Sequence, residues 1–188
     1  KNTGQPMIVE NKPGGAGIIA AQTVARAPGD GYSLLLVNTS MLSINPYTFK
    51  KKLPYDTEKS FKPVTGFLSS TLVLAVNKSV PATNVAEFAR WAKAQKTPVT
   101  YASFTAGNSS HFAGVILNEK LGLDLVHVPF NGTPPAVQNL IGEQVHAAFI
   151  PLTAVKQHVE SGKVKVLGVS SAKRSDLLPN VATFTEQG

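Results

Sequence analysis

The chain has 188 residues, of which 43% are hydrophobic and 15% are charged, and these proportions are typical of a folded α/β protein with one or two domains. No apolar run approaches the ~20 residues that a membrane-spanning helix needs, and the absence of cysteine excludes disulfides and thiolate metal sites. The net charge of +7 fits a charged surface rather than nucleic-acid binding, because the one dense basic run, Lys50 to Lys52, has no interleaved aromatic residues and no recognisable nucleic-acid module around it.

Strand and helix patterns alternate along the first half of the chain. Residues 7–11 predict a short strand, and residues 15–27 predict a helix that ends at a Pro-Gly-Asp-Gly turn. Residues 32–37 form a continuous apolar run, which is typical of a strand covered on both faces. Residues 38–63 contain prolines and predict a loop with one helical turn, and residues 72–77 predict the next strand.

The second half follows a regular strand–helix alternation. A helix over residues 84–95 begins with Asn84 as its cap and Glu87 three residues later, which is the spacing of a capping box. Gly122 is expected to end a later helix, and Thr133 to cap the one after it. Beyond residue 98 the predicted strands are residues 99–103, 125–130, 145–150 and 164–171, and the predicted helices are residues 108–122, 133–142 and 152–162. This alternation favours a parallel sheet with helices on its faces, and a change of composition at residues 96–98 predicts a domain boundary there.

The loops of this pattern are rich in Gly, Asn, Ser and Thr, and nearly all lead into predicted helices. They are residues 12–17, 38–45, 104–110, 131–135 and 151–153. In an open parallel sheet, ligands bind outside the carboxyl ends of the strands, where such loops lie. A helix start attracts an anion by about 0.3–1 kcal/mol, or about 2 kcal/mol when partly buried. Each loop by itself is explained as an ordinary helix cap, whereas their convergence on one edge favours an anion site.

Motifs for catalysis and for cofactors are incomplete. Residues 15–20, GAGIIA, fit a dinucleotide fingerprint, but Asn38 stands where an acidic residue is expected at the end of the next strand. Ser109 and His111 lie two residues apart on a predicted helix, so they point to different sides and form a poor nucleophile–base pair. The four histidines lack metal-site spacing, and no carboxylate pair lies on a candidate loop. The residues therefore favour binding without catalysis, cofactor or metal.

Four blocks of sequence resemble one family, in their order along the chain. They are residues 8–37, 101–114, 125–149 and 164–188, and their most specific parts are GNSSH at 107–111 and VPFNGTPPA at 128–136. On these blocks the chain resembles the Bug, or TctC-like, family of periplasmic solute-binding proteins of tripartite tricarboxylate transporters. The resemblance implies an α/β, two-lobed Venus flytrap fold with parallel or mixed sheets flanked by helices. It also implies a periplasmic location and a small carboxylate ligand, held in the cleft between the lobes and delivered to membrane permease subunits.

The same resemblance assigns lobes and ligand-facing residues. Residues 1–97 correspond to a first lobe that lacks its opening strand and helix, residues 98–170 to the second lobe, and residues 171–188 to a segment that returns toward the first. The positions expected to face the ligand are Asn38, Thr39, Ser103, Thr105, Asn108, Ser109, Phe130, Asn131, Gly132, Thr133 and Ile150. Family members usually carry an aspartate where Ile150 stands, so its loss disfavours ligands with an α-amino group and favours plain mono- or dicarboxylates.

Two alternatives to a transport receptor stay open at this point. A receptor of the same kind would serve a signalling partner instead of a permease, and a hydrolase would use Ser109 and His111. The family pattern extends beyond both ends of this chain, so we expect a fragment or a shortened form.

Overall fold

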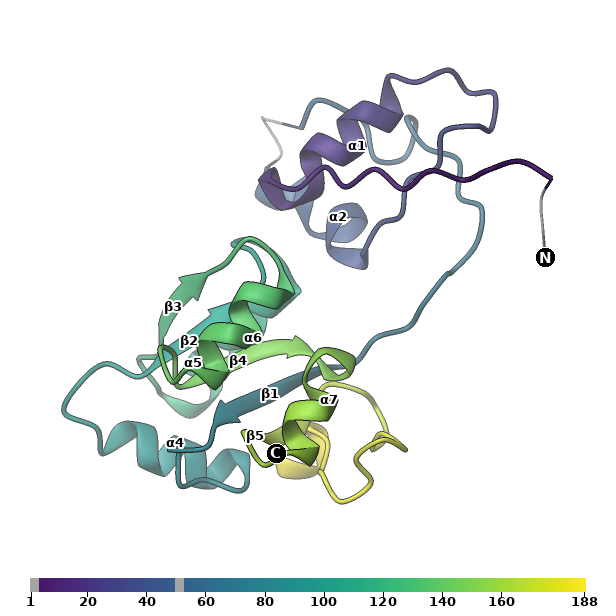
Figure 1. Ribbon diagram of the computed structural model, residues 1–188. Coiled ribbons are helices and arrows are strands. Elements are labelled where there is room, and N and C mark those ends of the chain that lie inside the picture. Colours follow the sequence, from purple (N-terminus) through teal and green to yellow (C-terminus); the bar gives the residue numbers. More distant parts are fainter. Residues whose placement is uncertain (1–3, 50–52) are drawn as a thin grey trace. The chain divides into compact units, whose positions relative to one another are not determined.

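The computed structural model describes residues 4–49 and 53–188, and the chain divides into two compact units, residues 1–63 and residues 64–188 (Figure 1). The basic run Lys50 to Lys52 lies outside the described residues. The division falls earlier in the chain than the boundary that composition predicts at residues 96–98. Strand β1, Leu72–Asn77, explains the difference, because it pairs with strands of the second unit and belongs to their sheet.

The first unit is built from short helices. They are η1 (Gly15–Gly17), α1 (Ile18–Ala25), α2 (Thr39–Ser43) and α3 (Asn45–Thr48). The helix predicted over residues 15–27 is confirmed, and residues 38–63 contain two short helices instead of one helical turn. Gly17 has a φ of 84°, and a Cβ at this position would lie 2.6 Å from the sulfur of Met41. Only glycine therefore allows α2 to pack this closely against the start of α1.

Two strands predicted in this unit are wrong. Residues 7–11 and 32–37 are irregular and belong to no sheet within the described part of the chain. A strand forms only when its N–H and C=O groups pair with a neighbouring strand, and no described residue supplies one here. Their apolar side chains are consequently exposed, as Ile8 (86%) and Leu36 (73%) illustrate.

The second unit contains a five-stranded sheet with the order β3-β2-β4-β1-β5. The other strands are β2 (Thr100–Ser103), β3 (Val126–Pro129), β4 (Ala147–Pro151) and β5 (Val164–Val169). β2 runs parallel to β3 and β4, while β1 runs antiparallel to both β4 and β5. The four strands β2 to β5 therefore point the same way, as the alternation from residue 99 onward predicts. The sheet is mixed because β1 is inserted between β4 and β5.

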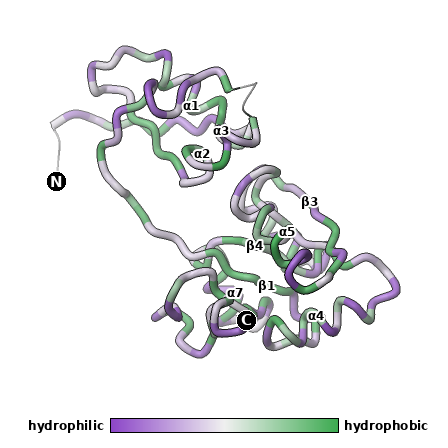
Figure 2. The backbone as a smooth tube through the Cα atoms, turned by 180° about the vertical axis from the view of Figure 1, so that it is seen from behind, coloured by the Kyte–Doolittle hydropathy of each residue, from purple (hydrophilic) through white to green (hydrophobic). Residues whose placement is uncertain are grey.

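Helices cover both faces of this sheet (Figure 1). They are α4 (Val85–Lys93), α5 (Ser109–Leu121), α6 (Thr133–Ile141) and α7 (Leu152–Glu160). Successive residues of β1 alternate between the two cores, so that Val73 packs with α6 and α7, and Leu74 packs with residues of α4 and α5. The central strands β1 and β4 are apolar apart from Asn77 at the end of β1 (Figure 2), because each of their faces lies against a layer of helices.

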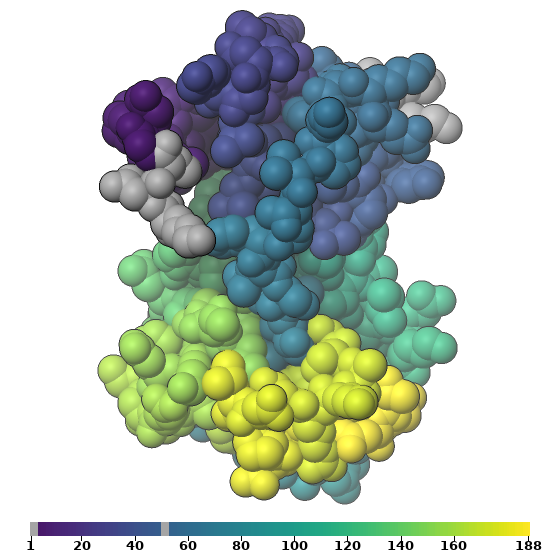
Figure 3. All heavy atoms as spheres, turned by 90° about the vertical axis from the view of Figure 1, so that its right-hand side faces the viewer, coloured from purple at the N-terminus to yellow at the C-terminus, as the bar shows by residue number. Residues whose placement is uncertain are grey.

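The last residues of the chain pack along β5. The N–H of Val169 donates to Ala182 O at 3.2 Å, Val169 O accepts from Phe184 N at 3.0 Å, and the Gln187 side chain donates to Leu167 O at 2.9 Å. This segment lies on the surface of the second unit (yellow in Figure 3). That residues 171–188 return toward the first lobe, as the resemblance implies, stays a prediction.

Caps fix where two of the helices start. Asn84 Oδ1 accepts the N–H of Glu87 at 2.8 Å, as a capping box requires. The Glu87 carboxylate accepts the N–H of Thr83 at 2.8 Å, instead of the N–H of the cap residue Asn84 itself. Thr133 does not cap α6, because Gly132 occupies the cap position and Thr133 is the first helical residue. Gly132 has a φ of 105°, which turns the chain into the helix one residue sooner than the prediction expects.

The close approach of β2 to α5 predicts a destabilising substitution. A Cβ on Gly114 would lie 2.1 Å from Cε2 of Tyr101, which is 1% exposed. Gly114→Ala should therefore lower the free energy of unfolding by about 1–3 kcal/mol, despite the higher helix propensity of alanine. The matched control is Gly66→Ala, whose added Cβ meets nothing within 4 Å. Urea denaturation followed by circular dichroism measures both, and equal midpoints would show that Tyr101 does not lie under α5.

Candidate functional site

The carboxyl ends of β2, β3, β4 and β5 lie at one edge of the sheet, since these strands point the same way. Helices α5, α6 and α7 follow β2, β3 and β4 and begin at that edge (Figure 1). None of the three carries an acidic residue in its first turn. Their own side chains therefore leave the positive ends of the helix dipoles available to an anion.

The loops after β2 and β3 are joined by backbone hydrogen bonds. The N–H of Phe130 donates to Ser103 O at 2.9 Å, and the N–H of Gly132 donates to Phe104 O at 2.9 Å. These bonds bring together most of the residues that the resemblance assigns to the ligand. They are Ser103, Thr105, Asn108 and Ser109 from the first loop, and Phe130, Asn131, Gly132 and Thr133 from the second.

Three polar side chains of these loops have no hydrogen-bond partner among the described residues. Within residues 4–49 and 53–188, the side chains of Thr105, Asn131 and Thr133 form no hydrogen bond. All three are at least partly exposed. Hydroxyl and amide groups in this situation donate to water in the free protein, and they can donate to a carboxylate oxygen without breaking a bond inside the protein.

Asn108 holds the first turn of α5 from a buried position. Its Oδ1 accepts three hydrogen bonds, from Ser110 N at 3.1 Å, from Ser110 Oγ at 2.9 Å and from His111 N at 3.1 Å. The hydroxyl of Ser110 in turn accepts the N–H of Phe104 at 3.2 Å, which fixes the start of the loop. The Nδ2 of Asn108 is buried and has no hydrogen-bond partner among the described residues. Such a buried, unpaired donor at a helix start is rare, and it adds to the unused donors of this edge.

Two histidines outside the predicted set of ligand residues lie beside the first loop. The rings of His111 and His127 stack, with centroids 3.9 Å apart and planes 15° apart. His127 Nε2 lies 2.6 Å from Ser103 Oγ, and His111 Nδ1 accepts the N–H of Gly107 at 3.1 Å. The parallel register pairs Tyr101 with His127 and so brings β3 to this position. That register cannot be read from one sequence, which is why the pattern missed the pair.

These contacts do not form a nucleophile and a base. Ser103 is fully buried, and its hydroxyl donates its single proton to Thr105 O at 2.9 Å. His127 must then donate from Nε2 to Ser103 rather than accept from it. Burial, with a smaller contribution from the neighbouring His111, lowers the pKa of His127 to about 4. The Ser109–His111 pair also lacks its base, because the His111 Nδ1 is already occupied by Gly107.

Of the three remaining predicted ligand residues, Asn38 and Thr39 belong to the first unit and Ile150 belongs to β4. Asn38 caps α2 in the first unit, where its Oδ1 accepts the N–H of Met41 at 3.1 Å, and Thr39 is the first residue of that helix. Both side chains are exposed. Ile150 is fully buried in the core between the sheet and helices α6 and α7, and packing accounts for it there.

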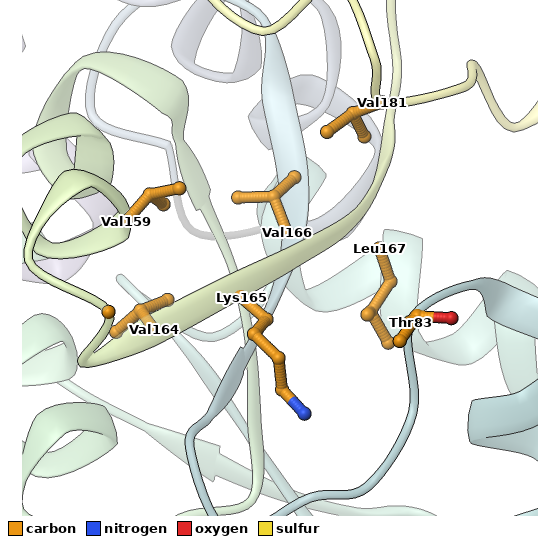
Figure 4. Close-up of a pocket in the computed structure, with 8 residues that line it drawn as sticks. Thr83, Val159, Val164, Lys165, Val166, Leu167 and Val181 are labelled. Carbon is orange, nitrogen blue, oxygen red and sulfur yellow. The ribbon is translucent and has the colours of Figure 1, made fainter.

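The hollow beside β5 is separate from these loops (Figure 4). Its volume is about 290 Å³, and valines from α7, β5 and the C-terminal segment are half of the residues that line it. Lys165 lines it as well, and its Nζ donates to the carbonyl of Val80. The hollow lies toward the amino end of β5, and none of the predicted ligand residues lines it.

Among the residues that the structure describes, no helix has the length and apolar character needed to cross a membrane.

Comparison with known proteins identifies relatives along the entire chain. The family described as "Tripartite tricarboxylate transporter family receptor", TctC, matches residues 1–188. The chain is 32% identical to a UPF0065 protein of Bordetella pertussis over 185 residues, and 37% identical to a UPF0065 protein of Bordetella bronchiseptica over 186 residues. These alignments cover 98% and 99% of this chain but only 57% and 55% of the relatives, so the chain spans little more than half of their length.

Solved structures show the same fold. R. palustris Rpa4515 with adipate has a TM-score of 0.92 at 29% identity, covering 99% of this chain and 62% of that one. MatC (Rpa3494) from Rhodopseudomonas palustris with bound malate has a TM-score of 0.87 at 30% identity, covering 98% and 63%. A further neighbour, described as a periplasmic transporter, reaches 0.93 at 36% identity and covers 98% and 62%.

The family and these neighbours are periplasmic solute-binding proteins and not enzymes. The chain has their α/β fold, and its family model matches from end to end. It therefore belongs to the tripartite tricarboxylate transporter receptor family, TctC.

Proposed function

We propose that this protein is a periplasmic receptor that captures a small carboxylate at the carboxyl edge of its sheet and delivers it to the membrane subunits of a tripartite tricarboxylate transporter. One observation carries the proposal. The starts of α5 and α6 lie on adjoining loops that have unpaired polar side chains and no acidic residue, in a chain whose neighbours hold adipate and malate. The other predicted ligand residues, Asn38 and Thr39, stay a prediction.

Anion capture at this edge relies on dipoles and neutral donors. No lysine or arginine occurs in residues 103–109 or 130–133. Each hydrogen bond to a charged group contributes about 1.5–3 kcal/mol, and a partly buried helix end adds up to about 2 kcal/mol. Two or three such bonds reach the roughly 8 kcal/mol that corresponds to micromolar affinity. Capture of this strength is reversible, which a receptor that hands over its ligand requires.

The polar groups at this edge favour carboxylates over amino acids. Residues 103–109 and 130–133 contain no carboxylate, and the buried Ile150 stands where the resemblance to the family implies an aspartate. An α-ammonium group bound here would lose its water without gaining a charged partner, and that loss is costly. Plain mono- and dicarboxylates, including the adipate and malate seen in the neighbours, satisfy the donors without introducing such a group.

Delivery requires that the transporter distinguish the loaded receptor from the empty one. A ligand shifts a conformational equilibrium only by the difference between its affinities for the two states. We therefore propose a hinge motion that the bound carboxylate stabilises, with the loaded form presented to the permease subunits.

Isothermal titration calorimetry against a ligand panel tests the proposed function. Adipate, malate, citrate and aspartate are titrated into the protein at pH 7.5, with adipamide as an uncharged control. At least one carboxylate should bind with a Kd near the micromolar range, and aspartate should bind at least about tenfold more weakly than malate because of its ammonium group. Binding of adipamide as tightly as adipate, or of no carboxylate at all, would reject the proposal.

Substitution of an unpaired donor should weaken the same binding. Thr133→Val keeps the shape of the side chain and removes its hydroxyl, so the affinity for the best carboxylate should fall about tenfold or more. The control is Gln138→Ala, an exposed change further along α6 that should leave the affinity unchanged. If the two substitutions changed the affinity equally, Thr133 would not be a ligand-binding residue.

A third measurement separates binding from hydrolysis. Ser109→Ala should weaken carboxylate binding only modestly, and p-nitrophenyl ester hydrolysis should be absent from the original protein and the variant alike. Ester turnover that disappears in Ser109→Ala would favour an enzyme instead.

A further inference from the structure

The stacked imidazoles of His111 and His127 support the loop between β2 and α5 from below. Their rings come from different elements, His111 from the first turn of α5 and His127 from β3. The stack has a centroid separation of 3.9 Å, and the ring of Tyr101 also contacts His127, with centroids 5.1 Å apart and planes 33° apart. The two imidazoles are therefore held by a third aromatic ring from β2.

Each imidazole is connected to the loop by one hydrogen bond of defined direction. The N–H of Gly107 has a proton to donate, so His111 Nδ1 must be its unprotonated acceptor, at 3.1 Å. Ser103 gives its hydroxyl proton to Thr105 O, so His127 Nε2 must carry the proton that reaches Ser103 Oγ. His111 therefore accepts a hydrogen bond from Gly107 of the loop. His127 donates to Ser103, whose hydroxyl in turn donates to the carbonyl of Thr105.

The two contacts respond differently to acid. Protonation of His127 leaves its Nε2–H donor in place, whereas protonation of His111 at Nδ1 removes the acceptor that holds Gly107. Gly107 has a φ of 76°, so its position in the turn depends on this contact and on the glycine itself. The loop thus keeps its described form only with a neutral ring at position 111.

Burial opposes a positive charge on His127. The titratable rings that contact His127 are His111 and Tyr101, and burial raises the pKa of Tyr101 to about 12, so the tyrosine stays neutral. Tyr101 donates its hydroxyl proton to His111 O at 3.1 Å, so it does not compensate a charged ring. Within the described residues, neither imidazole forms an ion pair with a carboxylate. For His127, a pKa of about 4 in the folded protein lies below the ordinary value, so its contribution to stability is complete above about pH 6.5 and is lost as the pH falls through 4.

We propose that His111 and His127 are positioning residues that hold the loop of residues 104–108 in its anion-binding form, and that this form depends on the neutral Nδ1 of His111. The proposal rests on the function proposed above and adds to it that acidification releases the loop. Carboxylate affinity should therefore fall as the pH is lowered, although a positive charge near the site would by itself strengthen anion binding.

Two substitutions at position 111 separate the hydrogen bond from Gly107 from the protonation of the imidazole. His111→Asn places an amide oxygen close to the position of Nδ1, so it can accept from Gly107 but does not titrate. His111→Phe keeps an aromatic ring for the stack and removes the acceptor. His158→Asn, on the last turn of α7, is the matched control for loss of a histidine elsewhere.

Hydrogen exchange of the Gly107 amide tests the proposal without a ligand. In the original chain and in His158→Asn, protection corrected for intrinsic exchange should fall about three- to tenfold between pH 7.5 and pH 5. His111→Asn should remain protected at both values, and His111→Phe should be unprotected at both. Equal protection of Gly107 in the original chain and in His111→Phe would overturn the proposal.

Calorimetry with adipate or malate over the same pH range tests the consequence for binding, with His111→Asn correcting for protonation of the ligand itself. Relative to this variant, the original chain should lose about three- to tenfold in affinity at pH 5. A gain in affinity would mean that a charged His111 is an anion ligand, and it would overturn the proposal. Loss of Gly107 protection with no carboxylate binding would reject the proposed function alone, since the exchange result does not depend on it.

Discussion

The common direction of β2, β3, β4 and β5 is the constraint on which the candidate site depends. Each of the first three strands is followed directly by a helix, so parallel strands place three helix starts at one edge of the sheet. The antiparallel strand β1 does not disturb this arrangement, because it contributes its amino end there and no helix. Backbone pairing between Gly132 and Phe104 then brings the first two starts within reach of one small molecule. The proposed affinity for an anion would thus originate in strand direction, before any particular side chain is considered.

The proposed site has neutral donors where many anion sites have arginine or lysine. A cationic side chain would hold a carboxylate more tightly, but it would need rotamer ordering and would bind other anions as well. Backbone N–H groups and short hydroxyls are fixed in place by the turns that carry them. Such groups lose little entropy on binding and give moderate affinity, which would suit the proposed role of a receptor that releases its ligand.

Sequence reasoning predicted the second unit better than the first. The strands and helices predicted beyond residue 98 are present in the structure. Gly122 ends α5 in the left-handed conformation that a glycine at this position predicts. These elements follow from local patterns, since glycines, caps and apolar periodicity act within a few residues. The strand predicted at residues 32–37 was wrong because an apolar run becomes a strand only where a neighbouring strand exists, and that is a property of the fold. The stack of His111 on His127 escaped prediction for a similar reason, because it depends on the register between β2 and β3.

Gly114 contributes to the histidine stack although it lies away from the loop. Its missing side chain leaves room for the ring of Tyr101, and the hydroxyl of that ring reaches the carbonyl of His111. A larger residue at 114 would push the tyrosine out, and a smaller residue at 101 would give up the hydroxyl. Positions 114 and 101 are therefore expected to change together during evolution or not at all. The small size of Gly114 thereby limits the positions that His111 can take at the start of α5.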